Sequence, residues 1–151
     1  MPTPGEIDTP TPTRTPTRTP TPVIGFEGCT PGYWKQNQHL DSWTATGYSP
    51  NQTIGSVFTI PSGSCAAQAN VSLKLALKLQ GGKTLCAARE TLLRAAVAAL
   101  LNAAHPTVDY ALSTAQVIAE VNAALASGDR KTILTLASRL DAFNNQGCPL
   151  N

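Results

Sequence analysis

Charged side chains are scarce in this 151-residue sequence, at 13% of its residues against roughly 25% in an average soluble domain. The net charge of +2 at pH 7 is small and scattered, so we expect no nucleic-acid partner. No apolar run reaches the roughly 18 residues that a membrane helix needs, so we expect no membrane span. The first residues lack the basic and apolar regions of a signal peptide, which suggests a trimmed or mature start.

Catalytic and metal-binding motifs are also missing. The sequence has no Gly-x-Ser-x-Gly, no His-Glu-x-x-His and no Walker loop. Its cysteines form neither a Cys-x-x-Cys pair nor a cluster with histidine, as a zinc site would need. Catalysis would have to use His39, Asp41, His105 or Asp109, which follow no known catalytic pattern. We therefore expect a protein that is not an enzyme and that has no cofactor and no bound metal.

Residues 1–22 form a region of their own, with seven of the 12 prolines and eight threonines. Proline fixes φ, lacks an N–H and restricts the residue before it, so a helix or a central strand is excluded there. Polyproline II remains, at about 3.1 Å per residue. The region is either a plain spacer or, as its accessible hydroxyls favour, a connector carrying O-linked sugars on Thr9, Thr11, Thr13, Thr15, Thr17, Thr19 and Thr21.

Residues 23–151 have the composition of one globular domain, which we expect to be helical. Apolar periodicity and capping residues predict helices over 66–80, over 85–104, from the capping box at 113–116 to Gly128, and after Asp129. Between residues 95 and 104 the second helix is apolar on every side except at Asn102, so it belongs at the centre. Residues 25–63 are rich in glycine, serine, threonine and aromatic residues, and they predict irregular loops with a short helix at 34–40 and an extended run at 56–60.

The expected fold class is thus all-α: a small bundle of about four helices, an irregular, disulfide-stapled N-terminal cap and an extended Thr/Pro-rich tail. Cys29, Cys65, Cys86 and Cys148 allow three disulfide pairings. A bridge from Cys29 to Cys148 would close the domain end to end, and one from Cys65 to Cys86 would then join the starts of two helices. The alternative is four unpaired thiols in a cytosolic protein, but the Thr/Pro region and the low charge favour an oxidising, extracellular location.

The segment 28–35 reads Gly-Cys-Thr-Pro-Gly-Tyr-Trp-Lys and resembles the signature of a poorly characterised family of bacterial secreted and cell-surface proteins. The resemblance continues at residues 39–43, 94–104 and 147–150, and it departs from the family pattern at Cys86. It implies a secreted, surface-associated module without an established enzymatic activity.

The signature also has a physical interpretation. Pro31 and Gly32 are turn residues, and Lys35 begins a polar stretch. Tyr33, Trp34 and Trp43 carry large apolar rings with polar atoms, which suits a cap on one end of a small bundle. The alternative is an exposed sugar-binding platform made of Tyr33, Trp34, Trp43 and Tyr48.

Together these features predict a secreted structural subunit of an extracellular fibre, whose partners are further copies of itself and covalent glycans. The extended region of one copy would dock on the next copy, and such a head-to-tail contact generates a filament. The alternative function is a carbohydrate-binding or adhesive module displayed on a glycosylated stalk.

Overall fold

The computed structural model describes residues 26–150. Within them it contains six α-helices, three short 3-10 helices and no β-strand, so the predicted all-α fold class is confirmed. None of the helices in this described part is long and apolar enough to cross a membrane. The Thr/Pro-rich region 1–22 and its candidate glycosylation sites lie outside the described residues.

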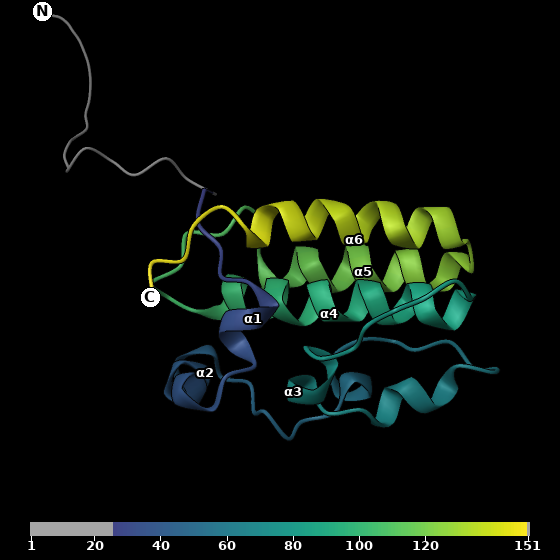
Figure 1. Cartoon of the computed structure of the whole chain (residues 1–151), viewed down its shortest axis with the longest axis horizontal. Helices are drawn as coiled ribbons and strands as arrows, with labels where there is room; N and C mark the ends of the chain where they lie inside the picture. The colour runs from purple at the N-terminus through teal and green to yellow at the C-terminus, as the bar shows by residue number, and fades with distance from the viewer. Residues whose placement is uncertain (1–25, 151) are drawn as a thin grey trace, which may run out of the picture.

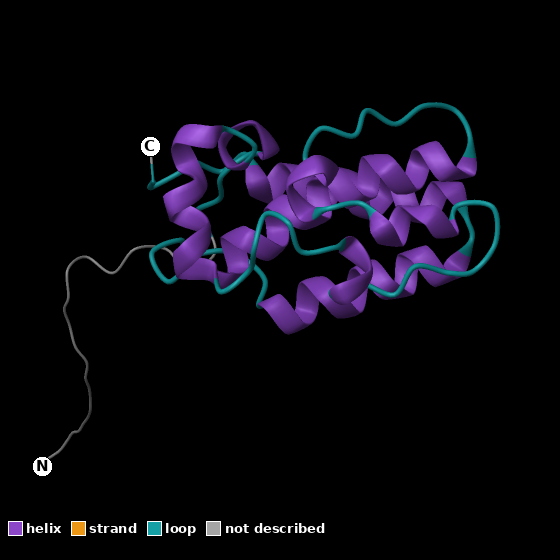
Figure 2. Cartoon of the chain, turned by 90° about the horizontal axis from the view of Figure 1, so that it is seen from below, coloured by secondary structure: helices purple, strands orange, loops and turns teal. Residues whose placement is uncertain are grey.

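The three long helices form the first layer, a bundle in which each helix packs on the other two: α4 (Leu85–Ala104), α5 (Thr114–Ser127) and α6 (Arg130–Asn144) (Figure 1). A second layer of short elements and loops lies against α4, as Figure 2 also shows from below. This cap layer contains α1 (Pro31–Trp34), α2 (Leu40–Thr46), α3 (Leu73–Ala76) and the 3-10 helices Asn37–His39, Ile54–Ser56 and Ala66–Asn70.

The ends of the long helices follow the predicted capping residues. Ser113 and Gln116 form both hydrogen bonds of a capping box at the start of α5. Gly128 ends α5 with a φ of +63°, a conformation that glycine adopts without steric cost. The side chain of Asp129 then accepts a hydrogen bond from the N–H of Thr132 and begins α6. These local signals act within a few residues, which is why they could be identified in the sequence.

Helix α4 is the central element, as its apolar composition predicts. Every residue from Ala95 to Asn102 is buried, because α5 and α6 cover one side of the helix and the cap layer covers the other. Alanine at six of the α4 positions between 87 and 99 keeps the surface of the helix narrow, so neighbouring elements pack close to its backbone.

The predicted helix over 66–80 is wrong, because it is split into the 3-10 helix Ala66–Asn70 and the short α3. Val71 is extended, and its carbonyl accepts a hydrogen bond from the N–H of Ile54. The N–H of Leu73 donates to the carbonyl of Gln52 at 2.7 Å, and Ser72 caps α3. The backbone here pairs with a neighbouring loop, and those bonds replace the ones of a continuous helix.

Two smaller predictions in the cap layer are also wrong. The sequence predicts a single short helix at 34–40. Instead, α1 begins earlier at Pro31 and ends at Trp34, a 3-10 helix follows at Asn37–His39, and α2, which the sequence does not predict, begins at Leu40. Thr30 explains the earlier start, since its side chain accepts a hydrogen bond from the N–H of Tyr33. The run expected to be extended at 56–60 begins inside a 3-10 helix, and its backbone turns at Val57 and Phe58.

Replacing Leu100 by alanine is expected to lower the free energy of unfolding by about 2–5 kcal/mol, because it opens a cavity in the centre of the core. Leu75→Ala is the matched control, since Leu75 is 52% exposed and should lose less than about 1 kcal/mol. Guanidinium unfolding measures both values. Equal losses in the two variants would contradict the central position of α4.

Candidate functional site at the N-terminal junction

The chain enters the described fold through an ordered segment at residues 27–29. Glu27 and Asp109 are joined twice: the N–H of Glu27 donates to the carbonyl of Asp109 at 3.1 Å, and the N–H of Asp109 donates to the Glu27 carboxylate at 2.8 Å. The N–H of Gly28 donates to the carbonyl of Gly147 at 2.9 Å in an isolated antiparallel bridge. A Cβ on Gly28 would overlap the carbonyl oxygen of Phe143, so only glycine allows this approach.

A disulfide follows directly on this bridge and joins Cys29 to Cys148, 119 positions apart. Cys29 is completely buried. The second disulfide joins Cys65, before the 3-10 helix Ala66–Asn70, to Cys86 in the first turn of α4. The first bridge therefore closes the domain end to end, and the second holds the cap layer on α4.

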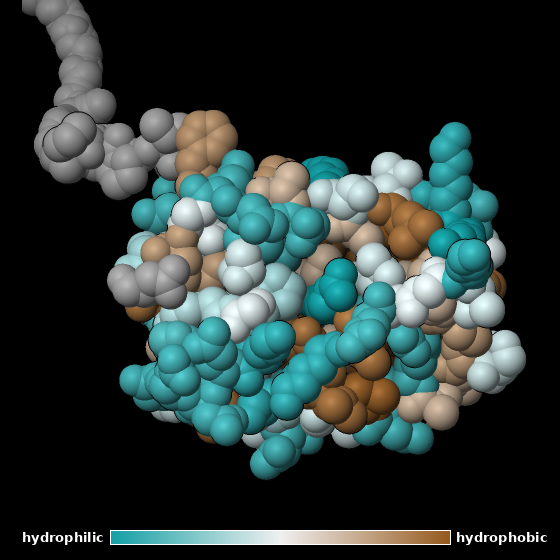
Figure 3. Space-filling view, viewed as in Figure 1, coloured by the Kyte–Doolittle hydropathy of each residue, from teal (hydrophilic) through white to brown (hydrophobic). Residues whose placement is uncertain are grey.

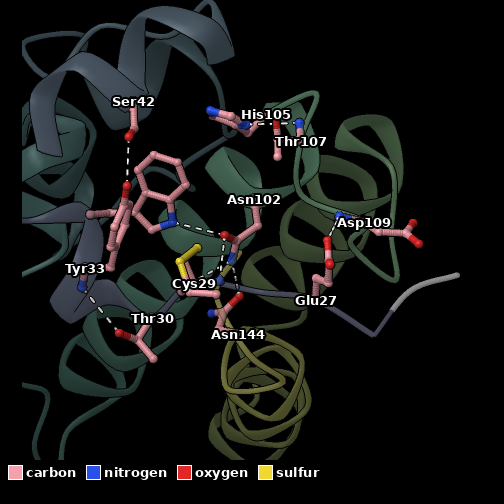
Figure 4. The surroundings of a disulfide bond; sticks show 12 residues. Glu27, Cys29, Thr30, Tyr33, Ser42, Asn102, His105, Thr107, Asp109 and Asn144 are labelled. Carbon is pink, nitrogen blue, oxygen red and sulfur yellow. Dashed lines mark hydrogen bonds between the residues drawn. A yellow bond between two sulfur atoms is a disulfide. The ribbon is translucent and has the colours of Figure 1, made fainter. Parts of the chain in front are cut away.

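Asn102 on α4 is the centre of the junction (Figure 4). Its Oδ1 accepts hydrogen bonds from the N–H of Cys29 at 2.8 Å and from Nε1 of Trp34 at 3.1 Å. Its Nδ2 donates to the carbonyl of Cys29 at 2.8 Å and to Oδ1 of Asn144 at 3.0 Å. All four hydrogen-bonding positions of this buried amide are thus used, which is the condition under which burying it is tolerated.

The polar network continues from Asn102 through Asn144 at the end of α6. Asn144 Oδ1 also accepts a 2.7 Å hydrogen bond from the Tyr110 hydroxyl, and Asn144 Nδ2 donates to the carbonyl of Ala95. Burial raises the pKa of Tyr110 well above its usual range, so the phenol remains a donor throughout the physiological pH range. One connected set of side chains therefore joins α4, α6 and the residues 29–34.

The signature residues form the aromatic cap of this junction. Trp34 is fully buried and Trp43 is 1% exposed, and the Nε1 of Trp43 donates to the carbonyl of Trp34 at 3.1 Å. The Tyr33 hydroxyl hydrogen-bonds the Ser42 hydroxyl at 2.8 Å. Pro31 stands in the first turn of α1, where its missing N–H costs no hydrogen bond, and Gly32 follows it. Lys35 ends α1 and is exposed.

The alternative of an exposed sugar-binding platform is therefore wrong for these aromatic residues. Tyr33, Trp34 and Trp43 face the core, and Tyr48 is partly buried against it. A sugar needs an open ring face to stack on, and these rings pack edge to face on one another, with centroids of Tyr33 and Trp34 5.2 Å apart.

The four candidate catalytic residues have separate environments. His39 stacks on Tyr33, with ring centroids 3.9 Å apart, and Asp41 is exposed in the first turn of α2. His105 is buried beside Trp34, and the main chain of Asp109 binds Glu27. No hydrogen bond joins any two of these four residues within residues 26–150. In the same range, no three His, Cys, Asp or Glu residues are grouped so that they could hold a metal ion.

No protein-family model, no curated protein and no solved structure matches this chain. The functional interpretation consequently depends on the residues of the junction. Sequence reasoning singled out Asn102 as the one polar residue of a buried segment, but it missed Gly28, Tyr110 and Asn144. A glycine before each of two cysteines, at 28 and 147, was a signal for the backbone pairing beside the disulfide.

Replacing Asn102 by leucine, which has a similar volume, is expected to cost about 3–5 kcal/mol of unfolding free energy, because the N–H groups of Cys29 and Trp34 lose their acceptor. Asn122→Leu is the matched control: Asn122 is half-buried and accepts one hydrogen bond, from the N–H of Thr59. It should cost only about 1 kcal/mol. Denaturant unfolding compares the two, and similar losses would contradict the central role of Asn102.

His105 predicts a pH dependence of stability. Burial lowers its pKa in the folded state, while the unfolded chain keeps the usual value of about 6.5. The stability is therefore complete above that value and decreases as the pH falls from about 6.5 toward the lowered folded-state pKa. His105→Asn removes the titration and keeps an acceptor for the N–H of Thr107, which His105 Nδ1 accepts at 3.1 Å.

Guanidinium midpoints at pH 7 and pH 5 measure this effect. The wild type should lose more stability between the two values than His105→Asn does. His39→Asn, a change at a partly exposed histidine, should keep the wild-type dependence. If the His105→Asn variant lost as much stability between pH 7 and pH 5 as the wild type, a group other than His105 would cause the pH dependence.

Proposed function

We propose that this protein is a structural, non-enzymatic subunit of an extracellular fibre, in which the Thr/Pro-rich region of one copy docks on the domain of the next. The observation that carries the proposal is the junction at residues 27–29. There the chain that follows the Thr/Pro-rich region is held by a disulfide at Cys29, by two hydrogen bonds between the Asn102 side chain and the backbone of Cys29, and by the Gly28 bridge.

This junction is suited to bear tension. A segment held only by backbone hydrogen bonds at its end opens one bond at a time, at a small free energy for each step. Here a pull on residues 1–25 would meet a covalent bond at Cys29, which passes the load to Cys148, just beyond α6. Asn102 would pass it to α4, the most deeply buried helix.

The proposed location is the cell exterior. Two disulfides are typical of proteins that fold in an oxidising compartment, and the resemblance of residues 28–35 to a secreted, surface-associated family has the same implication. O-linked sugars on the threonines from Thr9 to Thr21 would protect an extended connector from proteases. With low net charge and few charged residues, attached glycans would also keep such a fibre hydrated.

The face of the domain shown in Figure 3 favours assembly through an extended segment over assembly through a broad apolar contact. On the face shown in Figure 3, hydrophilic side chains surround several small, separate apolar patches. Permanent subunit contacts between folded domains are commonly large and apolar. A segment that docks on the neighbouring copy needs only a groove, and its repetition from copy to copy generates a filament.

Deleting residues 1–22 is expected to abolish fibre formation and to leave a folded monomer, since residues 29–150 supply a complete hydrophobic core and both disulfides. A chain in which residues 1–22 are replaced by a flexible Gly/Ser segment of equal length should also fold as a monomer and form no fibres. Electron microscopy and sedimentation measure the assembly, and circular dichroism measures the fold.

Cryo-electron microscopy of material from its native source tests the same proposal on the intact protein. Filaments with extra density on the threonines between Thr9 and Thr21 are expected. Fibres formed by the truncated chain would show that the Thr/Pro-rich region is not the connector. Discrete monomers in native material would contradict the fibre itself.

A further inference from the structure

A groove of about 680 Å³ opens next to the junction, where α1, the segment after α3, α4 and the end of α6 meet. Its apolar part consists of Pro31, Leu77 and Leu79. Its polar rim includes the side chains of Lys35, Lys78, Arg94 and Asp141. The groove thus combines a short apolar floor with charged groups around it.

The rim carries an excess of positive charge. Lys35, Lys78 and Arg94 contribute three cations against one carboxylate, that of Asp141. Arg94 is already engaged, because it donates a 3.0 Å hydrogen bond to the carbonyl of Leu79. The two lysines are exposed and form no salt bridge within the described residues, where one ion pair, Arg139–Glu120, is present elsewhere. Two ammonium groups in the same groove as apolar side chains suit an extended segment with carboxylates around an aliphatic residue.

The sequence outside the described residues contains one such segment, Glu6-Ile7-Asp8. Glu6 and Asp8 are the only carboxylates of residues 1–22, and Ile7 is their only branched aliphatic residue. The tetrapeptide repeat that follows carries Arg14 and Arg18, whose charges the lysines would repel. Charge complementarity therefore selects this acidic segment, and not the repeat, as the part of the Thr/Pro-rich region that fits the groove.

We infer that the groove binds the Glu6-Ile7-Asp8 segment of a second copy, with the carboxylates on Lys35 and Lys78 and Ile7 on the apolar floor. This inference rests on the proposed fibre and identifies the surface that receives the tail. The carboxylates and main-chain carbonyls of this segment are hydrogen-bond acceptors, and the lysines and the side-chain amide of Gln80 on the rim are donors that complement them.

The length of the region favours a second copy over the same copy. The groove reaches Thr30 and Pro31, so it lies beside the point where its own tail joins the domain. The 14 residues from 9 to 22 separate the acidic segment from the domain, and in polyproline II they would extend over roughly 40 Å. In that conformation, docking on the same copy would require the stretch to turn back toward the domain, and docking on the next copy would require no such turn.

Mixing two charge-reversed proteins tests the inference on the full chain. Glu6→Lys/Asp8→Lys reverses the tail, and Lys35→Glu/Lys78→Glu reverses the groove. Each variant alone should fail to form fibres, because its tail and groove then carry the same sign of charge. An equimolar mixture should form fibres again, because the acidic tail of one protein meets the basic groove of the other, and the lysine-bearing tail meets the glutamate-bearing groove. Lys83→Glu/Lys131→Glu changes the net charge of the chain equally at exposed lysines outside the groove, and it should assemble like the wild type.

A binding measurement separates this inference from the fibre proposal. A fluorescent peptide of residues 1–12 is titrated into the full-length Glu6→Lys/Asp8→Lys protein, whose own tail cannot compete. Adding Lys35→Gln/Lys78→Gln, which removes the positive charge without attracting the lysine-bearing tail, should weaken binding about tenfold or more, and adding Lys83→Gln/Lys131→Gln should change it less than about twofold.

The outcomes are distinct. Fibres that persist in Lys35→Glu/Lys78→Glu would overturn the groove and leave the fibre proposal standing. Peptide binding to the groove by a chain that never polymerises would support the groove and contradict the fibre. Equal weakening by the control pair would overturn the groove as the binding surface. A mixture that fails to assemble while the wild type does would overturn docking between copies.

Discussion

The contact between Asn102 and the backbone of Cys29 is the constraint on which the rest of the fold depends. A buried amide is tolerated only with all its donors and acceptors satisfied, and here the four partner atoms come from two distant segments, residues 29–34 and the end of α6. Cys29, Trp34 and Asn144 can therefore take only one arrangement around α4. The disulfide from Cys29 to Cys148 makes the same attachment covalent. Cys29 therefore carries both the hydrogen bonds to Asn102 and the disulfide that closes the longer of the two covalent loops.

The two layers of the fold are stabilised by different means. The long helices bury continuous apolar faces and are capped at their ends, which is sufficient for a helical layer. The cap layer has little regular structure of its own. It is held by the Cys65–Cys86 bridge, by two buried tryptophans and by loop-to-loop backbone bonds such as that between Leu73 and Gln52. Each of these supplies order that short helices alone would lack.

The functional proposal depends on which polar groups are buried in the core and which are exposed at the surface. The polar groups with the most specific geometry, Asn102, Asn144 and Tyr110, bind one another inside the core, and their amides and phenol serve to position the chain. The groove proposed to receive the tail has two lysines that form no salt bridge within the described residues, and it begins at Thr30 and Pro31, directly after the Cys29 disulfide. A protein of this kind is suited to attachment and repetition.

Much of this architecture was determined by the sequence alone. The helices over 85–104, 114–127 and 130–144 depend on apolar periodicity and on caps such as Ser113 and Asp129, which act within a few residues. The tertiary structure decided the rest. The stretch 66–80 has helical periodicity, yet its backbone bonds go to residues near 52 and 54, and the partners of Asn102 lie 42 to 73 positions away. Contacts at such separations form only once the chain has packed, so no local pattern could specify them.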